Sequence, residues 1–159
     1  MSDHDAPSAL ARAAAGALFF DEGDRVMLVR PTYKPDMDIP GGFVEPGETP
    51  YQACVREVRE ELGIRPPIGR LLVADWAPHP AKGDLILFVF DGDVLGPETL
   101  ARITFADHEL SAYDFHPVDE LDEMLIDRLA RRVKAAALAR DLGETVYLEH
   151  GRPILGKAV

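Results

Sequence analysis

The stretch TPYQACVREVREELG, residues 49–63, carries residues at both of its ends that begin and end helices. Thr49 can act as the N-cap, Pro50 suits the first helical position, and Gln52 completes a capping box. Gly63 suits the left-handed residue that commonly follows a helix. The sequence therefore predicts one helix with well-defined ends, around which the rest of the chain has to pack.

One side of this predicted helix is apolar. At about 100° per residue, Val55, Val58 and Leu62 fall on one stripe with Cys54 at its edge, and we expect this stripe to be buried. Cys54 is the only cysteine of the chain, so no internal disulfide can form, which fits a reducing compartment. We expect a cytoplasmic location and a structural role for Cys54.

The same helix carries Glu57, Glu60 and Glu61 at positions i, i+3 and i+4 on other faces. Like charges at this spacing repel one another, so either water or a cation has to accommodate them. Mg²⁺ and Mn²⁺ prefer carboxylate oxygens, whereas structural zinc prefers cysteine and histidine. Taken alone, the seven residues REVREEL are more typical of a solvated helix face than of a metal site.

The other elements follow from apolar runs and turn residues. Residues 13–20 and 25–31 predict a hairpin, and residues 31–48 predict a long loop, rich in proline and glycine, of the kind that is usually functional. The remaining expected elements are strands within 66–78 and 84–95, a short strand within 111–121, a helix over 122–142 and a strand or hairpin within 144–155. This mixture predicts an α/β (α+β) fold with a mixed sheet covered on both faces.

The predicted helix over residues 122–142 has Leu125, Leu129, Val133 and Ala137 on one stripe. We expect this stripe to face the sheet. We interpret residues 128–132, RLARR, as the solvated side of this helix rather than as a patch for nucleic acid.

Length and charge limit the class of protein. The 159 residues suggest a single domain over residues 11–159, preceded by a flexible tail over residues 1–10. A formal net charge of −11 argues against nucleic acid as the main partner. No apolar run has the length of a membrane span, and the acidic residues before residues 9–20 do not suit a signal peptide. We therefore expect neither a nucleic-acid nor a membrane partner.

A longer pattern surrounds the glutamates. Gly42 is followed by five residues, Glu48, seven residues and then REVREELGI, which ends at Ile64. This pattern resembles the Nudix box, the signature of the Nudix hydrolase family, at every defining position. The resemblance implies an α/β/α sandwich with a mixed central sheet. Homodimers are common in that family, so the resemblance also implies a homodimer as one assembly, without indicating an interface.

The resemblance also implies roles for individual residues. The implied metal ligands for Mg²⁺ or Mn²⁺ are the carboxylates of Glu57, Glu60 and Glu61. The backbone carbonyl of Gly41 resembles a position that often adds a ligand, and glycine lets the backbone approach a cation closely. Glu48 and Arg56 resemble the pair that ties the loop to the helix and orients the carboxylates.

The implied reaction is the metal-dependent hydrolysis of a diphosphate linkage in a nucleoside diphosphate derivative, with water attacking phosphorus. The general base is either a glutamate of the box or Glu109, which precedes a predicted strand and is otherwise a solvated loop residue. The alternative function is a ligand-sensing module that has lost catalysis, but degenerate modules usually lack one or more of the three glutamates. Isomerase chemistry would need a reactive cysteine, and Cys54 lies on the apolar stripe.

The sequence says less about the substrate, a small nucleotide-like molecule such as a nucleotide, ADP-ribose or a nucleotide sugar. The candidate substrate-binding residues lie on predicted loops or directly beside them: Tyr33, Lys34, Phe43, Trp76 and His79. Each of them is also compatible with a purely structural or solvated role. The sequence does not distinguish among the three classes of substrate.

Overall fold

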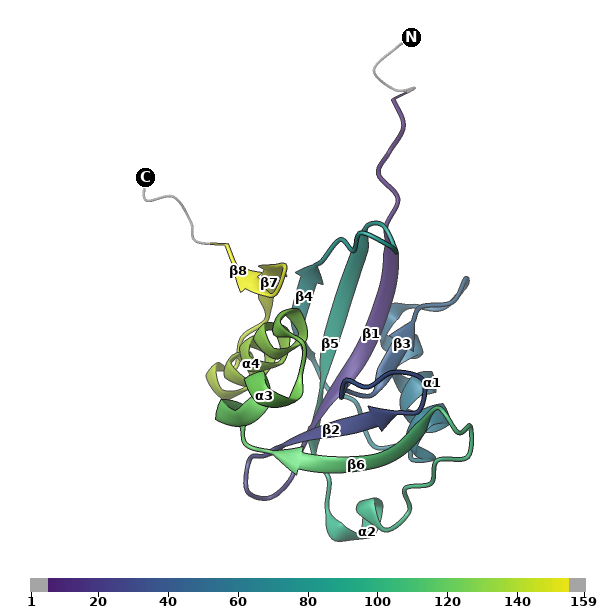
Figure 1. The fold of residues 1–159 in the computed structure, drawn as a ribbon, viewed down its shortest axis with the longest axis vertical. Coiled ribbons are helices and arrows are strands. Elements are labelled where there is room, and N and C mark those ends of the chain that lie inside the picture. The colour runs from purple at the N-terminus through teal and green to yellow at the C-terminus, as the bar shows by residue number, and fades with distance from the viewer. Residues whose placement is uncertain (1–5, 155–159) are drawn as a thin grey trace.

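Apolar residues continue without interruption through the second half of β1 (Arg12–Phe20), because this strand is buried on both of its faces. The computed structural model describes residues 6–154. Figure 1 shows β1 at the centre of a mixed sheet, with α3 and α4 on one face and α1 on the other. This arrangement confirms the predicted α/β/α sandwich with its mixed central sheet.

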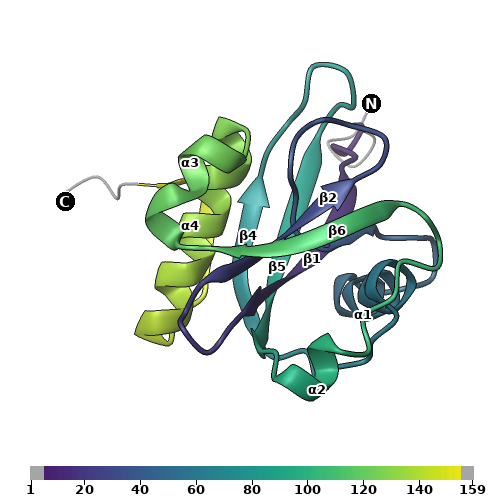
Figure 2. The ribbon, with the colours of Figure 1, turned by 60° about the horizontal axis from the view of Figure 1, so that its bottom comes forward.

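The elements after β1 are, in chain order, β2 (Val26–Pro31), β3 (Gly41–Phe43), α1 (Pro50–Leu62), β4 (Leu71–Trp76), β5 (Leu85–Val94), α2 (Pro97–Leu100), β6 (Leu110–His116), η2 (Val118–Glu120), α3 (Leu121–Met124), α4 (Asp127–Leu142), β7 (Val146–Glu149) and β8 (Arg152–Pro153). The strand order is β6-β2-β1-β5-β4-β7-β8, and β3 pairs separately with β1. The pairs β1–β5 and β4–β7 are parallel, and the other pairs are antiparallel. Figure 2 shows the same layers from below, with α1 and α4 well separated by the sheet.

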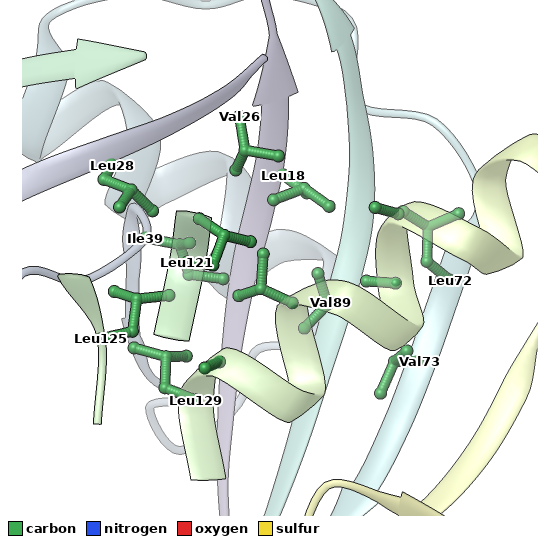
Figure 3. Packing of buried hydrophobic residues seen from close by; sticks show 14 of the residues in the cluster. Leu18, Val26, Leu28, Ile39, Leu72, Val73, Val89, Leu121, Leu125 and Leu129 are labelled. Atoms are coloured by element: carbon green, nitrogen blue, oxygen red, sulfur yellow. The ribbon is translucent and has the colours of Figure 1, made fainter. Parts of the chain in front are cut away.

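Two apolar cores result, one on each face of the sheet. Along β1, Leu18 and Phe20 belong to the core under α3 and α4, whereas Ala17 and Phe19 belong to the core under α1. This alternation is the period of two that a strand imposes on its side chains. Figure 3 shows the first core, in which Leu121 and other leucines of the α3–α4 segment pack onto the sheet.

The predicted ends of α1 are confirmed. The Thr49 hydroxyl accepts a hydrogen bond from the backbone N–H of Gln52, and the Gln52 side chain accepts one from the backbone N–H of Thr49. Gly63 ends the helix at φ 70°, in the left-handed region. The buried stripe is rotated from the expected one, because Cys54 is fully buried and Val55 is only half-buried.

Two other expectations need correction. Residues 31–48 are not all loop, because Gly41–Phe43 pair with Ala14–Gly16 of β1 as strand β3. The helix expected over 122–142 is two helices, because Leu125 adopts an extended conformation between α3 and α4. All four residues of its predicted apolar stripe are nevertheless buried.

Two further expectations concern the ends of the chain. Residues 1–5 of the expected N-terminal tail lie outside the described residues, and residues 6–11 contain no helix or strand. The predicted C-terminal hairpin is present as β7 and β8, although Leu155 at its expected end lies outside the described residues. Within residues 6–154, no helix is long and apolar enough to cross a membrane.

Truncating a leucine in the first core should destabilise the protein strongly. Leu18 is fully buried, so Leu18→Ala removes buried apolar surface and leaves a cavity, which should lower the free energy of unfolding by about 2–5 kcal/mol. Leu138 on α4 is 58% exposed, and Leu138→Ala should change it by less than about 0.5 kcal/mol. Urea denaturation of both variants measures the difference, and equal losses would contradict the assigned core.

Candidate functional site

Two adjacent glycines bring the backbone of β3 against the acidic side of α1. The backbone N–H of Gly41 donates a 2.7 Å hydrogen bond to Oε1 of Glu61. A Cβ atom on Gly42 would lie only 2.4 Å from Oε1 of Glu57. Because neither glycine has a side chain, β3 can lie directly beside the two carboxylates.

Glu109 reaches the same place from a different part of the chain. It lies directly before β6, and its backbone carbonyl accepts a 2.9 Å hydrogen bond from the N–H of Thr32, the residue after β2. The Thr32 hydroxyl also bonds to the carbonyls of His108 and Glu109. Glu57, Glu61 and Glu109 each offer a carboxylate oxygen, and these three oxygens lie within 4.8 Å of one another.

The acidic cluster, which we define as Glu57, Glu61 and Glu109, carries an electrostatic cost. Glu61 is only 4% exposed, and its burial raises its pKa to about 8, with further contributions from the charges of Glu57, Asp38 and Glu109. Burial also raises the pKa of Glu57. A divalent cation between these oxygens would offset this cost, because it favours the ionised form of each carboxylate.

Arg56 fixes the orientation of Glu57. Its guanidinium donates to both oxygens of Glu48, at 2.7 and 3.0 Å, and to Oε1 of Glu57 at 2.9 Å. It also donates to the backbone carbonyl of Phe43 at 3.0 Å. The hydrogen bond to Glu48 raises the pKa of Arg56, followed by smaller contributions from Glu57. The predicted contact between Glu48 and Arg56 is therefore present, and it joins the loop, β3 and the helix.

Glu60 and Gly41 differ from the arrangement that the sequence suggested. The Glu60 side chain is 45% exposed, accepts a hydrogen bond from Arg56 and is not part of the acidic cluster. Gly41 contacts the cluster through its N–H group. The assignments of Glu60 and of the Gly41 carbonyl as metal ligands stay predictions. Glu61 lies on the buried side of α1 and not on a separate acidic face.

Glu57 and Glu109 of the acidic cluster line a cavity of about 580 Å³, a size typical of small-molecule sites. Of the predicted substrate-binding residues, Tyr33, Lys34 and Phe43 line this cavity. Trp76 and His79 are not among its lining residues. Trp76 is half-buried on β4, and Nδ1 of His79 accepts a hydrogen bond from the N–H of Ala81 in the turn that follows.

Sequence reasoning missed Arg132, which also lines the cavity. We expected residues 128–132 to be solvated, but Arg132 is only 7% exposed, so that interpretation is wrong at this residue. A signal was available, because Arg132 lies three residues after Leu129 and four before Ala136, which are both buried. Arg132 is therefore on the buried side of α4.

Comparisons with known proteins agree with this geometry. A family model described as the NUDIX domain matches residues 10–138. An ADP-ribose pyrophosphatase of Methanocaldococcus jannaschii is 36% identical over 85 residues, which are 51% of this chain and 50% of that protein. Diphosphoinositol polyphosphate phosphohydrolase 2 of Homo sapiens is 47% identical over 62 residues, 38% of this chain and 34% of that protein. This chain thus spans half or less of these two relatives.

Solved structures are similar over most of the chain. A MutT protein from Methanosarcina mazei Go1 has a TM-score of 0.68 at 21% identity, covering 88% of this chain and 100% of that chain. The NUDIX domain of Shewanella oneidensis NrtR, solved in complex with ADP ribose, has a TM-score of 0.65 at 18% identity, covering 81% and 88%. At these identities the likeness supports the fold alone.

The two glycines of β3 should respond differently to alanine. A Cβ on Gly41 would lie 2.4 Å from the backbone oxygen of Ala15, so Gly41→Ala should destabilise the fold by about 1–3 kcal/mol. A Cβ on Gly42 meets only the end of the Glu57 side chain, so Gly42→Ala should keep the fold and, by displacing a metal-ligating carboxylate, weaken Mn²⁺ binding about tenfold. Thermal unfolding and Mn²⁺ titration separate the two effects, and unchanged Mn²⁺ binding in Gly42→Ala would contradict this account.

Without divalent cations, the fold should become less stable as the pH rises. The pKa of Glu61 rises from 4.5 to about 8 on burial, so between these values the folded protein holds a proton that the unfolded chain releases. The stabilisation that comes from protonated Glu61 is complete below pH 4.5 and is lost by about pH 8. The free energy of unfolding should therefore fall by roughly 2–4 kcal/mol over this range.

The measurement is urea denaturation in EDTA from pH 5 to pH 8.5, for the wild type and for Glu61→Gln. The variant lacks the titrating group, so its free energy of unfolding should fall less over this range. Parallel pH profiles for the two proteins would show that Glu61 is not buried in its protonated form.

Proposed function

The chain belongs to the NUDIX family, and on that basis we propose that it hydrolyses a diphosphate linkage in a nucleoside diphosphate derivative. The observation that carries this proposal is the acidic cluster, in which two carboxylates of α1 meet one from the loop before β6, and Glu57 and Glu109 line one cavity. Isolated surface glutamates would not require two close glycine contacts and a buried carboxylate. A cation site beside the backbone of β3 gives a physical reason for both.

The donor set of the cluster suits Mg²⁺ or Mn²⁺. All three groups are carboxylates, which these cations prefer, and in the part of the chain that the structure describes no histidine or cysteine belongs to the cluster. Glu57 and Glu61 would hold the cation, with Glu60 as a further ligand after rotation of its exposed side chain. The bound cation would supply positive charge to the diphosphate and acidify the attacking water.

The chain's own residues supply orientation and a base. Arg56 and Glu48 hold Glu57 in place, and the Gly41 N–H does the same for Glu61. Glu109 is exposed, and we assign it as the general base that accepts a proton from the attacking water. The water oxygen forms a bond to phosphorus, the P–O–P bond breaks, and a phosphorylated group leaves.

Two observations support a small nucleotide-like substrate. The cavity of about 580 Å³ suits a ligand of nucleotide size. One relative is named an ADP-ribose pyrophosphatase. Another relative, from Roseobacter denitrificans, is named an RNA pyrophosphohydrolase, but the net charge of −11 makes a long polyanion a poor partner here.

A second candidate function is ligand sensing without turnover. The NUDIX domain of NrtR was solved with bound ADP ribose, so the fold can hold a nucleotide-like ligand in that protein. The buried and fixed carboxylates of this chain favour catalysis. The two candidates differ in one measurable respect, because a sensor binds its ligand and leaves the diphosphate linkage intact.

Replacing single carboxylates should abolish hydrolysis. Glu57→Gln and Glu61→Gln should each remove Mg²⁺-dependent turnover, and Glu109→Gln should lower kcat by about 10²–10⁴-fold, as expected for the loss of a general base. Glu98→Gln, at an exposed residue of α2, is the matched control and should keep wild-type turnover.

The assay supplies nucleoside diphosphate sugars, ADP-ribose and nucleoside triphosphates with Mg²⁺ or Mn²⁺, and detects released phosphate or phosphomonoester. EDTA should stop the reaction. Tight ligand binding without turnover of any substrate would favour the sensor. Unchanged kcat in Glu109→Gln would remove that residue from the mechanism.

A further inference from the structure

Arg132 is a buried cation in the wall of the cavity. It lies on α4, whereas Glu57 lies on α1, which covers the opposite face of the sheet (Figure 1). Both residues line the same cavity. The Arg132 side chain is 9% exposed. A buried guanidinium is costly unless its N–H donors are paired.

Only one edge of this guanidinium has a partner. Nε of Arg132 donates a 2.6 Å hydrogen bond to Oδ2 of Asp75 on β4. Asp75 is fully buried, and its other oxygen accepts a 3.0 Å hydrogen bond from the N–H of Gly151. Within residues 6–154, the two terminal Nη nitrogens of Arg132 have no hydrogen-bond partner, so Asp75 fixes the side chain while its outer edge stays available.

The charge of this pair favours an uncharged ligand group. The buried carboxylate of Asp75 already balances the guanidinium, although burial still lowers the pKa of Arg132. A phosphate placed there would add a buried charge without a counter-ion, which is expensive. Two neutral hydrogen-bond acceptors would pair the free Nη donors and add no buried charge.

The surroundings of Arg132 suit a flat apolar group. The part of the cavity formed by the sheet and α4 is lined by small or aliphatic residues of β1, β5 and α4: Ala14, Gly16, Leu87, Val89 and Leu129. A planar ring with polar atoms only at its edge could pack there.

We propose that Arg132 binds the nucleobase of the substrate and selects bases that present two adjacent acceptors. Guanine does so with O6 and N7, which arginine pairs through two parallel hydrogen bonds, and cytosine does so with O2 and N3. Adenine places an amino donor beside each acceptor that arginine could reach in this way, and uracil places an N–H between its carbonyls. This inference rests on the proposed function only in assuming a nucleotide ligand.

The test uses four substrates that differ only in the base: GDP-glucose, CDP-glucose, ADP-glucose and UDP-glucose, each with Mg²⁺. For the wild type, kcat/KM should be about tenfold or more higher for guanine or cytosine than for adenine and uracil. The pair GDP-glucose and CDP-glucose then shows which of the two acceptor edges Arg132 binds. Equal values for all four bases, as expected if Arg132 bound an anionic group, would overturn the inference, as would a preference for adenine or uracil.

Arg132→Lys keeps the charge that Asp75 needs but replaces the two-pronged donor by a single ammonium group. The base preference should fall to within about twofold, mainly through a higher KM for the preferred substrate. Arg131→Lys is the matched control: Arg131 donates to the carbonyl of His150 and is not among the cavity's lining residues, so the preference should persist. A preference that survives Arg132→Lys would overturn the inference, and thermal unfolding verifies that both variants fold.

Calorimetric binding of GMP, CMP, AMP and UMP separates this inference from the proposed function. Tighter binding of GMP or CMP, without hydrolysis of any glucose nucleotide, ADP-ribose or nucleoside triphosphate, would support the role of Arg132 and contradict the proposed hydrolase. Hydrolysis without a base preference would support the hydrolase and contradict the role of Arg132. Equal binding of all four monophosphates would contradict the role of Arg132 whether or not hydrolysis occurs.

Discussion

The close contact between the glycines of β3 and the glutamates of α1 is the constraint on which the site depends. The Gly41 N–H holds the buried Glu61, and Gly42 leaves room for the carboxylate of Glu57. This contact exists because β3 pairs with β1, which also pairs with β2 and β5 at the centre of the sheet. The central strand therefore positions both the strand and the helix that form the acidic cluster.

The site combines two different electrostatic environments. At the α1 side, carboxylates are gathered with Arg56 as their nearest counter-charge, which suits a cation. On the α4 side, the Asp75–Arg132 pair is balanced internally, and β1, β5 and α4 add apolar residues to the cavity wall, with Asp38 as a further charge that acts on Arg132. A ligand with a charged diphosphate at one end and a flat base at the other matches both environments, which is why the two proposals refer to one cavity.

Local signals explain which features the sequence could predict. The ends of α1 follow from Thr49, Pro50 and Gly63 alone, and the structure confirms them. β3 was missed because three residues, two of them glycine, carry no strand pattern, and their pairing with β1 is a long-range contact. Glu109 was singled out from its position before a strand, but only the fold brings its carboxylate near α1. Arg132 was expected to be exposed because it lies in an arginine-rich stretch, although its helical spacing from Leu129 and Ala136 places it on the buried side of α4.

The account's central claim is that Glu57 and Glu61 hold a divalent cation beside the cavity. Anomalous diffraction from a crystal soaked in Mn²⁺ tests it most directly. We predict one anomalous peak or more within coordination distance of both carboxylates, about 2.0–2.4 Å from their oxygens. A crystal that binds no Mn²⁺ there while its Glu57 and Glu61 side chains remain free to coordinate would contradict the account.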